Sequence, residues 1–103
     1  MPFEHYLSQS AAITQGAAGQ TQIVAAQANH KIQVLGYVVV MDAAGTFKFQ
    51  SANTDKTGAM PAAANGGVSS SEAPFSTEKN EALNITTTVG KAFGHVAYRL
   101  IPA

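Results

Sequence analysis

The segment from residue 31 to residue 50, KIQVLGYVVVMDAAGTFKFQ, limits the possible folds of this chain more than any other part of it. Residues 31–41 are rich in β-branched and aromatic side chains, and residues 46–50 alternate apolar with polar side chains, as a half-buried strand does. Between them, Asp42 can hydrogen-bond its own backbone and Gly45 can adopt a positive φ. The pattern predicts a β-hairpin and, with it, an all-β domain.

Further short runs of the same kind follow along the chain. Besides the hairpin, strands are predicted over residues 20–26, 68–71, 74–77, 83–89 and 92–101. About six to eight strands at this spacing indicate an antiparallel β-sandwich or a small barrel, and no helical periodicity competes with this interpretation.

The second half of the run 31–41 is apolar on both faces. One face holds Ile32, Val34, Gly36, Val38 and Val40, and most of the other consists of Leu35, Tyr37, Val39 and Met41. A chain of 103 residues has no material for a third layer, so a strand that is apolar on both sides should face the core with one side and a second subunit with the other. We therefore predict that Tyr37, Val39 and Met41 help to bury an oligomer interface.

Residues 1–19 differ from the rest, because small and polar side chains predominate there. Such a segment has too few large side chains to form a core. We predict an extended N-terminal arm over residues 1–19 and a sandwich domain over residues 20–103, with a frayed terminus as the alternative. In the arm, Phe3, Tyr6 and Leu7 are the anchors expected to contact a neighbouring subunit.

Composition narrows the functional classes. Charged residues make up 12% of the chain, with six basic and six acidic side chains, whereas soluble proteins average about 25%. The sequence contains 46% hydrophobic residues. A protein with this composition and so few charges gains by burying part of its surface against other copies, so we predict a homo-oligomer. Scattered lysines and a net charge of zero argue against nucleic-acid binding.

No leader or membrane segment is expected from the pattern. Glu4 and His5 stand where a secretory signal would carry basic residues, and no apolar run approaches the ~18 residues of a membrane span. Cysteine is absent from the sequence. These features indicate synthesis in the cytoplasm.

The residues that carry chemistry in enzymes are not grouped in this sequence. His5, His30 and His95 lack the spacing of a metal pair, and residues 53–58 lack the acidic ligands of a calcium loop. Residues 69–71 have no glycine-framed nucleophile turn around them. The sequence therefore predicts no catalytic, cofactor-binding or metal-binding residues, and a protein that is not an enzyme.

Several motifs of the body resemble those of a known group of proteins. They are K-I-x-V-L-G-Y-V, A-G-T-F-K-F-Q-S, T-G-A-M-P-A-A-A-N-G-G, E-A-L-N-I-T and G-H-V-A-Y, within residues 31–101. In these motifs the chain resembles small structural proteins of tailed-bacteriophage virions, most closely their capsid decoration or cement proteins. The resemblance implies a jelly-roll-like sandwich, commonly a homotrimer, on the outer surface of the capsid, with the major capsid protein as its partner. It assigns no individual contact residues.

A second class remains open. A tail or head-fibre module with the same sandwich would bind a host receptor or glycan through its loops, above all residues 51–71. The few aromatic and charged residues of that segment count against sugar binding.

Overall fold

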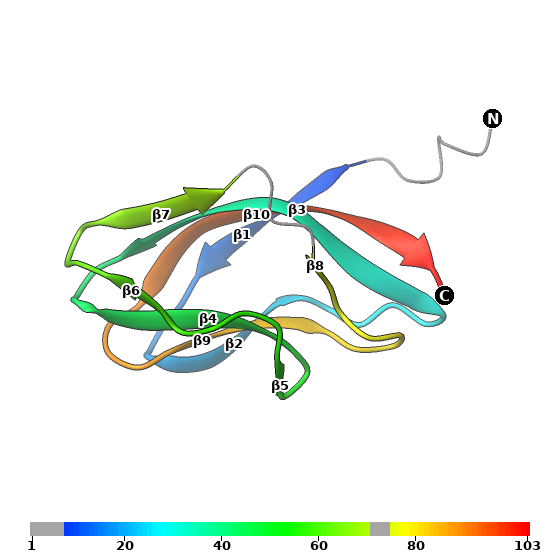
Figure 1. Ribbon diagram of the computed structural model, residues 1–103, viewed down its shortest axis with the longest axis horizontal. Coiled ribbons are helices and arrows are strands. Elements are labelled where there is room, and N and C mark those ends of the chain that lie inside the picture. The colour runs from blue at the N-terminus through cyan, green and yellow to red at the C-terminus, as the bar shows by residue number, and fades with distance from the viewer. Residues whose placement is uncertain (1–7, 71–74) are drawn as a thin grey trace.

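The computed structural model describes residues 8–70 and 75–103 of the chain. These residues form strands, turns and loops, and the all-β prediction is confirmed (Figure 1). The strands are β1 (Gln9–Thr14), β2 (Gly19–Val24), β3 (His30–Met41), β4 (Gly45–Ser51), β5 (Thr54–Asp55), β6 (Met60–Ala62), β7 (Gly67–Ser70), β8 (Phe75–Ser76), β9 (Leu83–Thr87) and β10 (Ala92–Pro102). Within these ranges no helix is long and apolar enough to cross a membrane.

The strands form two antiparallel sheets that pack face to face (Figure 1). Sheet A has the order β1-β10-β3-β7, and β8 also pairs with β3. Sheet B has the order β2-β9-β4-β5, and β6 also pairs with β4. The chain is thus an antiparallel β-sandwich, as its alternating pattern predicts.

Apolar side chains from the inner faces of both sheets form one core. Phe49 of β4 lies at its centre, with ring centroids 5.0 Å from Tyr37, 6.0 Å from Phe47 and 5.6 Å from Phe75. Phe47 and Phe49 are fully buried. The tilted and edge-on ring arrangements are those that aromatic pairs prefer, so this cluster joins the two sheets.

The hairpin prediction for residues 31–50 is wrong. Strand β3 belongs to sheet A and β4 to sheet B, so residues 42–44 carry the chain from one sheet to the other instead of reversing it within a sheet. Both strands bury one row of large apolar side chains, Val39 and Met41 on β3 and Phe47 and Phe49 on β4. Two such rows bury more apolar surface when they face each other across the core than when they lie side by side in one sheet.

Strand β3 contains a β-bulge at Leu35. Opposite β10, Val34 pairs with Tyr98 and Gly36 pairs with Ala97, which leaves Leu35 without a partner. One extra residue in a strand moves every later side chain to the other face of the sheet. Val34 therefore points into the core before the bulge, and Tyr37 points into it afterwards.

This bulge corrects the predicted oligomer interface. Tyr37, Val39 and Met41 are buried inside a single chain, with Val39 and Met41 fully inaccessible, and all three belong to the core cluster. Strict alternation from Ile32 along the strand predicts that these three side chains lie on the outer face, because the sequence pattern gives no sign of the bulge. The outward side chains of this half of β3 are Val38 and Val40.

The boundary of the predicted arm also needs correction. Within residues 1–19, β1 is an integral strand of sheet A, paired with β10 over its whole length, and it buries Ile13 in the core. Small side chains do not prevent a strand from pairing through its backbone, and one large apolar side chain is enough to fix its face. Residues 1–7, with Phe3, Tyr6 and Leu7, lie outside the described residues.

Candidate interaction surface

Four loops meet at one end of the sandwich, at the left of Figure 1. They connect β1 to β2, β3 to β4, β6 to β7 and β9 to β10, and we call this the alanine end. Its exposed alanines are Ala17, Ala18, Ala44, Ala63 and Ala64. Asp42 and Lys91 are the charged residues of these loops, so this end of the protein has few charged side chains.

The large apolar side chains that stay exposed lie at this same end. Val89 of the β9–β10 loop is 56% exposed, Val40 of β3 is 37% exposed and Phe93 of β10 is 36% exposed. Among the described residues no other large hydrophobic side chain is exposed to this degree. Their concentration at one end, beside the alanines, makes this end the apolar surface that burial would cover.

Gln15 makes the alanine end rigid. Its side chain is only 2% exposed, and its Oε1 accepts hydrogen bonds from the backbone N–H of Ala92 (2.8 Å) and from Thr87 Oγ1 (3.0 Å). Its Nε2 donates to the carbonyl oxygen of Gly19 (2.9 Å) and to Thr21 Oγ1 (3.2 Å). One amide therefore ties β1, β2, β9 and β10 together beneath the loops.

The charge on Asp42 is engaged by backbone. Its Oδ1 accepts a hydrogen bond from the N–H of Lys91 at 2.6 Å, and its own N–H donates to the carbonyl of Lys91 at 3.1 Å. Gly90 has φ 78°, and a Cβ there would lie 2.6 Å from Asp42 Oδ1, so glycine permits this close approach. The β3–β4 and β9–β10 loops are thus locked to each other.

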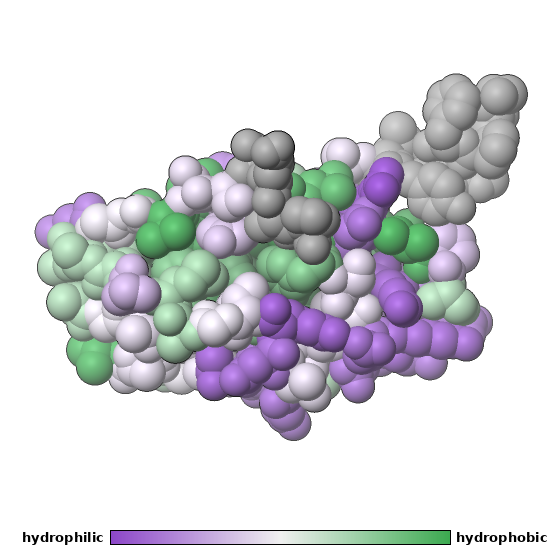
Figure 2. Space-filling model, in the orientation of Figure 1, coloured by the Kyte–Doolittle hydropathy of each residue, from purple (hydrophilic) through white to green (hydrophobic). Residues whose placement is uncertain are grey.

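Two ion pairs lie away from the alanine end, on and beside β5. Lys56 Nζ lies 2.6 Å from Glu78 Oε2, and Lys48 Nζ lies 3.1 Å from Asp55 Oδ2. Figure 2 shows hydrophilic residues from the region of β5, near the middle of the long axis, to the turn before β9, whereas the end with the β6–β7 loop is mostly weakly polar to hydrophobic, with some hydrophilic residues at its tip. The sandwich is therefore less polar at the alanine end than over the rest of the face shown.

Both carboxyls of these ion pairs are perturbed. Hydrogen bonds from Gln50 and from Lys48 lower the pKa of Asp55, and the hydrogen bond from Lys56 lowers the pKa of Glu78. Each carboxylate is thereby held in its charged form, which keeps this region hydrated.

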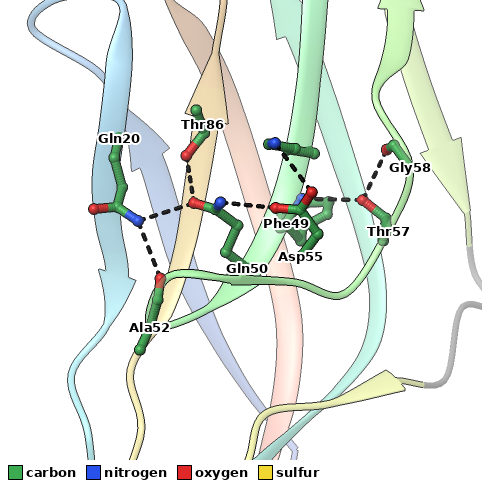
Figure 3. Close-up of polar contacts among 9 residues, drawn as sticks. Gln20, Phe49, Gln50, Ala52, Asp55, Thr57, Gly58 and Thr86 are labelled. Atoms are coloured by element: carbon green, nitrogen blue, oxygen red, sulfur yellow. Dashed lines mark hydrogen bonds and ion pairs between the residues drawn. The ribbon is translucent and has the colours of Figure 1, made fainter.

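The outer face of sheet B carries a polar network centred on Gln50 (Figure 3). Gln50 Oε1 accepts from Gln20 Nε2 (2.9 Å) and from Thr86 Oγ1 (2.5 Å), while Gln50 Nε2 donates to Asp55 Oδ1 (2.9 Å). Gln20 Nε2 also donates to the carbonyl of Ala52 (3.0 Å). The first part of the predicted binding loop, residues 51–71, is thus tied to the sheet through its own polar groups.

A shallow depression of about 620 Å³ lies on the outer face of sheet A. It is lined by Ser8, Leu35, Gly36, Tyr37, Val38, Ser69, Ser70, His95 and Ala97. In the described parts of the chain, no group of three or more His, Cys, Asp or Glu side chains is placed to hold a metal ion.

The sequence pattern missed the residues that define this surface. Strict alternation places Val40 on the inner face because the sequence gives no sign of the bulge, and nothing in the pattern indicates that Val89 and Phe93 stay exposed. A signal was nevertheless present, because the turns read G-A-A-G at residues 16–19, D-A-A-G at 42–45 and A-A-A-N-G at 62–66. Turns of soluble proteins usually carry charged or polar side chains, so repeated alanine pairs indicate a covered surface.

Comparison with family models, with curated proteins and with solved structures gives no match for this chain. The likeness to decoration proteins therefore rests on the sequence motifs quoted above.

Proposed function

We propose that the protein is a non-enzymatic decoration or cement protein of a tailed-bacteriophage capsid. In this proposal it is made in the host cytoplasm, binds the outside of the major capsid protein lattice as a homo-oligomer, and stabilises the head. The observation that carries the proposal is the contrast between the alanine end, which has few charged side chains, and the region of the ion pairs on and beside β5. The alanine end contacts the lattice, and the region of the ion pairs faces water.

The order of strands supports the jelly-roll form of the sandwich that the resemblance implies. Sheet A holds β1, β3, β7, β8 and β10, and sheet B holds β2, β4, β5, β6 and β9, with β1 beside β10 and β2 beside β9. Sheets in which the first strand lies beside the last, and the second beside the last but one, arise when a long hairpin is rolled up, as in viral jelly rolls.

The physical properties of the alanine end suit repeated weak binding. Gln15 and Asp42 hold three of its loops and the backbone of Met41 bonds to the β6–β7 loop, so little conformational entropy is lost when they are covered. Small side chains let backbone approach a flat partner closely. An oligomer that places several such ends on one lattice gains avidity through effective concentration, so each contact can be modest.

The alternative, a fibre module that binds a receptor or glycan through residues 51–71, has less support. The polar groups of Asp55 and Thr57 in this segment already bond to Gln50 and to the N–H of Phe49. This class is retained as an outcome of the experiment below.

Co-sedimentation with empty heads of the encoding virus, prepared without this protein, tests the proposal. Wild-type protein should bind at a fixed ratio to capsid subunits. Val89→Asp, which puts a charge in place of the most exposed large apolar side chain of the described residues, should weaken binding by about tenfold or more. The matched control Ala26→Asp adds the same charge at the opposite end and should bind like wild type.

Two results would overturn the proposal. Stoichiometric binding that is insensitive to Val89→Asp would show that another surface contacts the lattice. Failure of the wild-type protein to bind heads, together with binding to host cells or cell-wall glycans, would favour the fibre module.

A further inference from the structure

Strand β1 leaves one edge of sheet A open. It runs for six residues, Q-S-A-A-I-T, pairs with β10 along one side, and has no strand of the described chain on its other side. It contains no charged residue, no proline and no register shift. An edge with unpaired N–H and C=O groups and none of these protective features can pair with another strand.

The other edges of the sandwich are each interrupted. Strand β2 has a register shift between Gln22 and Val24, and β6 contains Pro61. Strand β5 has only two residues, one of them Asp55, and the β7 and β8 edge is divided into pieces of four and two residues. The contrast with β1 indicates that its unprotected edge serves to pair with another strand.

The hydrogen bonds to β10 show which groups of β1 point outward. The N–H of Gln15 donates to the carbonyl of Ala92 at 3.1 Å, so Gln15 faces β10. Bonded and non-bonded positions alternate along an antiparallel pair. Ser10, Ala12 and Thr14 therefore direct their N–H and C=O groups to the open edge, and all three have exposed side chains.

We propose that β1 pairs with β1 of a second copy, antiparallel and centred on Ala12. In this register Ser10 of each copy lies opposite Thr14 of the other, and the two Ala12 residues face each other across a two-fold axis. All outward backbone groups of residues 10, 12 and 14 then find partners, and sheet A becomes continuous through both copies. Such an isologous contact gives a closed dimer.

The dimer differs from the trimer that the resemblance implies. A three-fold ring would need β1 to meet a different edge of its neighbour, and the remaining edges are the interrupted ones described above. The inference concerns self-association alone, so it stands or fails independently of capsid binding.

Mass measurement by light scattering at micromolar concentration is the first test. Wild-type protein should have twice the mass of one chain, and Ala12→Pro should have the mass of one chain. Proline removes an N–H that the fold of one chain does not use, so the thermal unfolding of this variant should stay cooperative. Ala12→Ser keeps the N–H and should remain a dimer.

Cross-linking tests the register, and it does not depend on whether the proline variant folds. The chain has no cysteine, so Ala12→Cys carries a single thiol. Opposed residues of a hydrogen-bonded antiparallel pair have Cα atoms about 5.5 Å apart, within the range of a disulfide. Mild oxidation should convert Ala12→Cys to covalent dimer and leave the control Ala26→Cys monomeric on a denaturing gel.

A wild-type mass of one or three chains would overturn the inference. Equal cross-linking of Ala12→Cys and Ala26→Cys would do the same, because it would show random collision.

Discussion

Val40 of β3 and Phe93 of β10 are direct cross-strand neighbours on the outer face of sheet A, and both remain more than a third exposed, at 37% and 36%. A valine beside an aromatic ring is a favourable pair in a sheet, yet here it faces solvent rather than core. The pair lies at the alanine end, next to the loop that holds Val89. The apolar surface therefore includes side chains of two paired strands as well as side chains of the loops.

Replacing this pair by serines should reduce binding more than stability. We expect Val40→Ser with Phe93→Ser to cost about 1 kcal/mol of unfolding free energy, the scale of one cross-strand pair, while binding to empty heads falls below detection. Urea unfolding and co-sedimentation measure the two effects. Parallel losses in both would show that the pair serves only the fold.

The bulge at Leu35 predicts opposite responses at adjacent positions. Val39→Ala should cost about 2 kcal/mol, since it opens a cavity in the core, whereas Val38→Ala on the outer face should cost less than about 1 kcal/mol. Denaturant unfolding of the two variants gives the comparison. The reverse order would mean that the strand continues without the bulge.

The stability of the protein should be sensitive to Gln15. Gln15→Leu removes the acceptor for the buried N–H of Ala92 and should destabilise the protein by about 3 kcal/mol, because buried groups are left without partners. Exposed Gln22→Leu is the matched control and should change stability by less than about 0.5 kcal/mol. Equal midpoints in urea for both variants would contradict the role of Gln15.

Acid should weaken the fold through Asp55 and Glu78. The pKa of each carboxyl is lower in the folded chain than in the unfolded chain, so the unfolded chain takes up protons first as pH falls. Their contribution is present above roughly pH 4 and is lost as pH drops through the folded values. In the double variant Asp55→Asn with Glu78→Gln, the melting temperature should therefore fall less steeply between pH 5 and pH 3 than in the wild type. Above pH 6 its dependence on pH should change little. An unchanged acid slope would show that other groups determine it.

The class of fold could be predicted because side-chain alternation is a local property. Leu83 and Ile85 mark one face of β9 as buried, and the structure confirms it. The pairing of strands was harder to predict from the sequence. Whether β4 follows β3 within a sheet or across the core depends on all rows of buried side chains together, and Asp42 and Gly45 are compatible with both.

The candidate surface was the least predictable part. A single unpaired residue, Leu35, exchanges the inner and outer side chains of half a strand, and nothing in the residue types announces it. The alanine end depends on four loops that are distant in sequence and meet only in the fold. Their shared composition becomes informative once the topology brings them together.

The most direct measurement of the central claim is hydrogen–deuterium exchange of the protein, free and bound to empty heads. We predict slower exchange on binding in residues 42–45, 63–66 and 88–91, with exchange in residues 78–81, in the turn before β9, unchanged. Slower exchange at residues 78–81 with no change in the loops of the alanine end would contradict the account.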